Sequence, residues 1–186
     1  SPSHALSGPF TIEFFVYHER NSGASSGSVQ DLYFSINAVS SNFWIGRKQT
    51  SNEFQLRLPN ASPAIAEATE TIDVGSWFHI AIVRNGGTTK GYLNGTERIS
   101  VTHSYDLDFA TSDNPTIGDY YAGSYPTDGF ISNFRIVKGT AVYTSNFTAP
   151  TSALTAISGT VFLALQGNTP FVDNSSSSHT ITNLNT

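Results

Sequence analysis

Three tyrosines, Tyr120, Tyr121 and Tyr125, stand close together in a polar stretch that spans residues 103–128. A tyrosine ring has an apolar face and a hydroxyl group, which suits it to stacking on the C–H surface of a sugar while nearby polar groups bind the sugar hydroxyls. The same side chain is equally suited to packing across its own loop or against a neighbouring subunit. Both interpretations stay open, and Tyr120, Tyr121, Tyr125 and Asp128 are the candidate ligand-binding residues.

Acidic and amide side chains in this stretch suggest a metal site as a second kind of chemistry. Asp113, Asn114, Asp119 and Asp128 offer the oxygen ligands that hard cations such as Ca²⁺ prefer. Aspartate and asparagine also cap turns, which is their usual role in loops. Because the spacing lacks the dense pattern of a dedicated calcium loop, the sequence favours turn capping, and Ca²⁺ is retained as a candidate cofactor.

Catalytic residues are not indicated. Glycoside hydrolysis needs two carboxyl groups about 5–5.5 Å apart, or about 6.5–9.5 Å apart for inversion. Glu67 and Glu70 would face opposite sides of a strand, and Asp106 and Asp108 stand among turn-forming residues. The histidines show neither a Ser-His-Asp arrangement nor metal-ligand spacing. We therefore predict that the protein is not an enzyme.

Long apolar runs at residues 77–84 and 129–143 predict strands that are covered on both faces. His79 alternates with Trp77 and Ala81 in the first run, so we expect a partly buried histidine bonded to a neighbouring polar group. Trp44 and Trp77 each lie in an apolar run, which predicts that both are core residues.

Turn residues divide the chain into short segments with the two-residue period of β-strands. Asn85-Gly86-Gly87 and Asn94-Gly95 are typical hairpin turns. Residues 140–143 suggest a short turn of helix, and residues 65–72 a strand or an extended connection. The other strands are expected at residues 10–17, 31–37, 42–47, 53–58, 77–84, 88–93, 97–102, 115–118, 130–138, 161–165, 171–172 and 179–184. This pattern predicts an all-β protein, a two-sheet antiparallel jelly-roll sandwich.

Four strings in order carry a family resemblance: Trp-Phe-His-Ile-Ala-Ile-Val-Arg at 77–84, Tyr-Leu-Asn-Gly at 92–95, Thr-Ile-Gly at 116–118, and the run at 129–143. Together they resemble the laminin-G-like, concanavalin A-like jelly-roll domains found in bacteriophage structural (tail or decoration) proteins. The resemblance extends from residues 10–14 to residues 171–175. It implies surface binding or assembly rather than metabolism, and such domains often bind Ca²⁺ at a loop rim.

The chain departs from this family pattern in two places. Ser132 and Asn133 stand where many relatives carry an Asp-Glu pair, so no role of that acidic pair is carried over. Residues 1–9 are too short and too rich in Pro, Ser and Gly to form the strand that such domains usually have first. We therefore expect an open sheet edge near residues 179–184, covered by another part of a longer polypeptide or by another chain.

Composition limits the function further. The chain has 186 residues, 38% of them apolar, no Cys and a net charge of −5. These values predict a single domain spanning residues 1–186, without disulfides or thiolate metal sites, and they disfavour nucleic acid as a partner. The first residue is Ser1 rather than Met, which we interpret as a sign of a larger polypeptide or assembly. Neither a membrane-spanning run nor a signal peptide is seen.

The function predicted from these observations is that of a non-enzymatic, lectin-like adhesion or decoration module of a virion or other extracellular assembly. Its expected partners are cell-surface glycans and identical or neighbouring structural subunits, without membrane insertion. The alternative is a purely structural subunit that joins copies of itself and has no glycan ligand.

Overall fold

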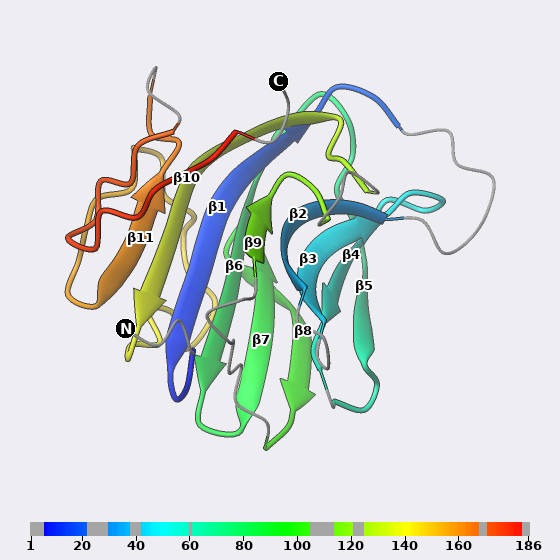
Figure 1. The fold of residues 1–186 in the computed structure, drawn as a ribbon. Coiled ribbons are helices and arrows are strands. Elements are labelled where there is room, and N and C mark those ends of the chain that lie inside the picture. Colours follow the sequence, from blue (N-terminus) through cyan, green and yellow to red (C-terminus); the bar gives the residue numbers. More distant parts are fainter. Residues whose placement is uncertain are drawn as a thin grey trace.

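The computed structural model describes residues 6–21, 30–37, 42–59, 61–104, 114–120, 125–167 and 171–183. Two antiparallel sheets face each other in this part of the chain (Figure 1). The first has the strand order β11-β10-β1-β6-β7-β8, and the second has the order β5-β4-β3-β2-β9. The strands are β1 (Phe10–His18), β2 (Gln30–Asn37), β3 (Phe43–Lys48), β4 (Glu53–Arg57), β5 (Ile65–Thr71), β6 (Trp77–Asn85), β7 (Thr88–Leu93), β8 (Thr96–Thr102), β9 (Asn114–Ile117), β10 (Gly129–Lys138) and β11 (Thr160–Ala164).

The predicted all-β sandwich is therefore confirmed, with two local errors. Residues 171–172 and the described part of 179–184 form a single bridge between Val172 and Thr180 instead of strands. Residues 140–143 are not helical, because Thr11 of β1 forms hydrogen bonds with their backbone groups. Its hydroxyl donates to Thr140 O and accepts from Val142 N. No described segment forms a helix of the length and apolarity needed to cross a bilayer.

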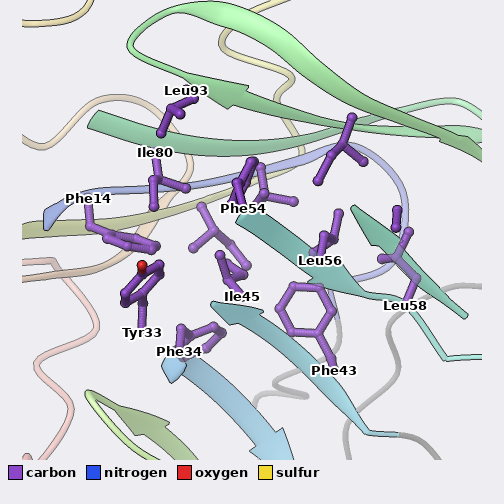
Figure 2. Packing of buried hydrophobic residues seen from close by; sticks show 14 of the residues in the cluster. Phe14, Tyr33, Phe34, Phe43, Ile45, Phe54, Leu56, Leu58, Ile80 and Leu93 are labelled. Atoms are coloured by element: carbon purple, nitrogen blue, oxygen red, sulfur yellow. The ribbon is translucent and has the colours of Figure 1, made fainter. Parts of the chain in front are cut away.

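The core lies between the sheets and is rich in aromatic rings (Figure 2). Phe14 of β1 stacks on Phe134 of β10 with ring centroids 5.1 Å apart. In β2 the register shifts between Leu32 and Phe34, and Tyr33 and Phe34 both pack in the core. Such a bulge interrupts the strict alternation of a strand. Leu32 is also buried but lies outside this core cluster, on the outer face of the second sheet.

A buried carboxylate attaches the segment 139–155 to the outer face of the first sheet. Glu13 of β1 accepts hydrogen bonds from Arg135 Nε at 3.0 Å and Tyr143 Oη at 2.9 Å, and it contacts His79 Nε2 at 3.2 Å. Burial would raise the pKa of Glu13, but the hydrogen bond with His79 and the charge and hydrogen bonds of Arg135 outweigh it and lower the pKa. The expected polar partner of His79 is thus confirmed.

The outer edge of the first sheet is β11, and the chain itself covers part of it. Leu163 N donates to Asp173 Oδ1 at 3.0 Å, Asn174 N donates to Leu163 O at 2.7 Å, and Ser175 Oγ donates to Val161 O at 3.1 Å. The described part of residues 179–184 forms no strand, so the edge strand is β11 and not residues 179–184 as expected. A turn that begins at Asp173 satisfies three backbone groups of this edge, and its covering by a second chain stays a prediction.

A second buried polar cluster joins the two sheets. Arg47 of β3 donates to Asp31 of β2 at 2.8 Å and to Ile72 O at 2.7 Å. His18 of β1 contacts the Tyr33 hydroxyl through Nε2 at 2.9 Å. Burial and the neighbouring charge of Arg47 lower the pKa of His18 to about 4, although Asp31 acts in the opposite direction.

We predict that this histidine makes the fold sensitive to mild acid. The pKa of His18 is near 4 in the folded protein and about 6.5 in the unfolded chain, so the unfolded chain takes up the proton first as the pH falls. The stabilisation is complete above pH about 6.5 and is lost towards pH about 4, by about 3 kcal/mol in the free energy of unfolding. Urea unfolding measured across this range checks the prediction.

The control is His18→Gln, which keeps a hydrogen-bonding side chain and removes the titration. Its unfolding free energy should change less between pH 6.5 and 4 than that of the wild type. Equal pH dependence in both proteins would contradict the assignment.

Candidate functional site

A pocket of about 210 Å³ opens on the outer face of the second sheet. Its lining comes from β2, β3 and β4, from the residue before β3 and from the loop after β9: Leu32, Asn42, Trp44, Arg57, Tyr120 and Tyr125. Trp44 of β3 and Arg57 of β4 are directly paired across the strands, so their side chains stand next to each other on the same face. The pocket therefore combines aromatic rings, an amide and a guanidinium group.

Asp119 shapes the loop from Asp119 to Thr127 that supplies the two tyrosines, which we call the tyrosine loop. Its Oδ1 accepts hydrogen bonds from Tyr120 N at 2.6 Å and from Tyr125 N at 2.9 Å, which brings both ends of the loop together. Two hydrogen bonds then hold the loop on β2: Leu32 N donates to Tyr125 O at 3.1 Å, and Thr127 Oγ1 donates to Leu32 O at 2.8 Å. Figure 1 shows the described ends of this loop beside β2.

The rings of Tyr120 and Tyr125 meet edge to face, with centroids 5.8 Å apart and an angle of 80° between the planes. This is a favourable arrangement for two aromatic rings. Two of the predicted ligand-binding residues therefore lie in one pocket. Tyr121 lies outside the described residues.

Asp128, the fourth candidate, does not line this pocket and instead forms an ion pair with Arg20. Arg20 donates to the two carboxylate oxygens at 2.9 and 3.2 Å. Of the predicted metal ligands, Asp113 and the side chain of Asn114 lie outside the described residues. Asp119 and Asp128 already have the partners given above, and among the described residues no three acidic or histidine side chains gather into a metal-binding group. A Ca²⁺ site here stays a prediction.

Sequence reasoning missed the part of the pocket that the sheet contributes. Trp44 is buried, with 6% of its surface exposed, yet it lies outside the core cluster and beneath the tyrosine loop. The signal was the alternation of β3: Phe43 and Ile45 pack in the core, so Trp44 between them must face outward. Arg57 follows the buried Leu56 in the same way.

Trp77 is a clear correction, because 49% of its surface is exposed. It forms an aromatic row with Tyr17 and Phe130 across β6, β1 and β10, with ring centroids 5.6 Å and 6.2 Å from that of Tyr17. The segment 139–155 packs on the outer face near Ala81, Val83 and Tyr92. Residue 77 lies beyond that cover, which is why the apolar strand β6 begins with an exposed tryptophan.

A second hollow of similar volume lies between β6, β7 and the segment 139–155. Two of its polar groups are already used by the fold. Lys90 pairs with Glu97 at 2.8 Å, and the Tyr143 hydroxyl donates to Glu13. The pocket beneath the tyrosine loop is therefore the better candidate site.

A family model described as the concanavalin A-like lectin/glucanases superfamily matches residues 1–144. The chain belongs to this superfamily. The match confirms the resemblance that the sequence strings indicated. A search of curated proteins finds no significant match.

Solved structures of this superfamily fold share little sequence with the chain. A protein of Bacteroides ovatus that is proposed to bind carbohydrate superposes with a TM-score of 0.69 at 15% identity, covering 95% of this chain. The chain spans about half of that protein, 51% of its length. The CBM40 module of a Ruminococcus gnavus sialidase, bound to α2,3 sialyllactose, gives 0.51 at 13% identity, with 66% of this chain and 71% of the module covered. A heptameric pentraxin of Limulus polyphemus gives 0.50 at 12% identity, with 73% and 70% covered.

We predict that Asp119 holds the tyrosine loop over Trp44. In the background Trp77→Phe, Trp44 is the remaining one of the two tryptophans of the chain, so its fluorescence reports on the pocket. Adding Asp119→Ala removes the acceptor of two backbone N–H groups and should cost about 1 kcal/mol of stability. We expect a red shift of the emission and stronger quenching by acrylamide.

Asp119→Asn retains a carbonyl oxygen and is the matched variant, which should resemble the Trp77→Phe parent. Unchanged quenching in Asp119→Ala would show that the loop does not depend on this side chain.

Proposed function

We propose that the protein is a non-enzymatic glycan-binding module of a virion or other extracellular assembly, and that the pocket beneath the tyrosine loop binds the sugar. The observation that carries this proposal is the combination of Trp44, Tyr120 and Tyr125 with the polar side chains of Asn42 and Arg57. Aromatic faces pack on sugar C–H groups, while amide, guanidinium and hydroxyl groups bind sugar hydroxyls. A volume of about 210 Å³ is smaller than the roughly 300–1,000 Å³ of pockets for drug-sized ligands, so it favours a small sugar over a long chain.

Further support comes from the carboxylates and from the fold. None of the lining residues that the structure describes carries a carboxylate, whereas glycoside hydrolysis uses two. The deeply buried acids Glu13 and Asp31 are engaged with arginines in the fold. Two of the solved structures with this fold are named for carbohydrate binding, so sugars are the first ligand class to test. The virion is proposed from the resemblance to bacteriophage structural domains.

A glycan array followed by calorimetry tests the proposal. We expect the wild type to bind at least one glycan, and Tyr120→Ala or Tyr125→Ala to lower its affinity about tenfold or more, since 1.4 kcal/mol corresponds to tenfold. Trp77→Ala is the matched control, because it removes an exposed ring on the other sheet. Binding lost in Trp77→Ala but retained in the tyrosine variants would move the sugar site to the aromatic row.

The same titration in calcium and in EDTA tests the predicted metal site. Loss of binding in EDTA, restored by Ca²⁺, would support a calcium ion near Asp119. Equal affinity in both solutions would remove calcium from the proposal. Absence of binding to any glycan in either solution would contradict the proposed function.

The alternative, a structural subunit that binds copies of itself, has one observation in its favour. Tyr17, Trp77 and Phe130 form an exposed aromatic row, and aromatic residues are enriched at protein interfaces. This alternative predicts concentration-dependent association in sedimentation equilibrium that Trp77→Ser and Phe130→Ser abolish. A monomer at every concentration would contradict it.

A further inference from the structure

We propose that the sugar bound in this pocket is an acidic one and that Arg57 binds its carboxylate. The inference rests on the proposed function and specifies its ligand class. It starts from the state of the arginine side chain. Arg57 Nε is buried and makes no hydrogen bond within the described part of the chain.

Four other arginines of the described chain have carboxylate partners, and Arg84 Nε donates to Gly86 O. Arg20 pairs with Asp128, Arg47 with Asp31, Arg98 with Glu70 and Arg135 with Glu13. A buried donor of a charged group that lacks a partner is costly, so proteins rarely keep one without use. An anion that enters the pocket would supply the missing acceptor.

The charges around the pocket favour an anion. Arg57 is the charged residue among the six that line it, so the lining is positive although the whole chain carries −5. Glu67 of the neighbouring strand β5 is opposite Gln55, not Arg57, and accepts a hydrogen bond from Gln55 at 2.5 Å. Lys48 lies 3.6 Å from the same carboxylate. Glu67 therefore has other partners than Arg57.

Geometry favours a planar carboxylate on a ring. The guanidinium group of arginine presents a flat fork of donors that fits a carboxylate with two parallel hydrogen bonds. Arg57 and Trp44 are paired residues on neighbouring strands, which fixes the fork beside an aromatic ring. A pyranose carboxylate can then bind to Arg57 while the C–H face of the ring packs on aromatic side chains and the Asn42 amide reaches a hydroxyl.

Calorimetry with galacturonic acid, its methyl ester and galactose tests the inference, and glucuronic acid with glucose and sialic acid extend the set. We expect the acid to bind at least tenfold tighter than the ester and the neutral sugar. Its affinity should fall as salt increases, because the interaction is between charges. Arg57→Gln should remove the preference for the acid while the weaker binding of neutral sugar persists.

Arg57→Lys retains the charge without the fork and should show an intermediate preference. Lys138→Gln on β10 of the other sheet removes a positive charge elsewhere and should change nothing. Thermal unfolding of each variant establishes that it folds. If Arg57→Gln does not fold, Arg57→Lys provides the comparison.

The outcomes separate the two proposals. The wild type could bind neutral and acidic sugars equally well, and Tyr125→Ala could lose that binding. This result would overturn the acidic ligand and leave glycan binding standing. Preference for the acid that survives in Arg57→Gln would overturn the role of Arg57. A galactose sulfate bound more tightly than galacturonic acid would overturn the choice of a carboxylate. No binding of any sugar would count against the proposed function itself.

Discussion

The site of this protein depends on the alternation of side chains in β3 and β4. Burying Phe43, Ile45, Phe54 and Leu56 between the sheets stabilises the fold by about 1.5–3 kcal/mol for each side chain. A slip of either strand by one residue would move these side chains to the outer face, so the register is firmly set. Trp44 and Arg57 must then face outward beside each other. The energy of the core thus builds the floor of a surface pocket.

Buried ion pairs attach the remaining parts to this frame. The pair of Glu13 and Arg135 holds the segment 139–155. The pair of Asp31 and Arg47 joins β2 to β3 beside Leu32, the residue to which the tyrosine loop is anchored. Such pairs contribute little net stability because desolvation offsets their attraction. Their effect is to fix position. Arg57 differs from these arginines because its buried Nε has no partner within the described chain.

The two outer faces of the sandwich are suited to different tasks. The second sheet carries a small pocket with a polar and aromatic lining. The first sheet is covered by segment 139–155 at one end and presents the aromatic row at the other. A row of flat, exposed rings suits a broad contact rather than a small molecule. The pocket and the aromatic row therefore lie on different sheets of the sandwich.

The sequence by itself determined the strands, the hairpin turns and the superfamily, because these depend on local period and turn chemistry. It also singled out Tyr120 and Tyr125 as candidate binding residues of one loop, and both line the pocket. It could not separate Trp44 from Trp77, since both lie in apolar strands. Whether such a residue is covered depends on distant parts of the chain. The tyrosine loop lies over Trp44, whereas segment 139–155 does not reach Trp77. The partners of Arg57 and of the β11 edge were likewise decided by tertiary structure, because a hydrogen bond between residues far apart in sequence leaves no local pattern.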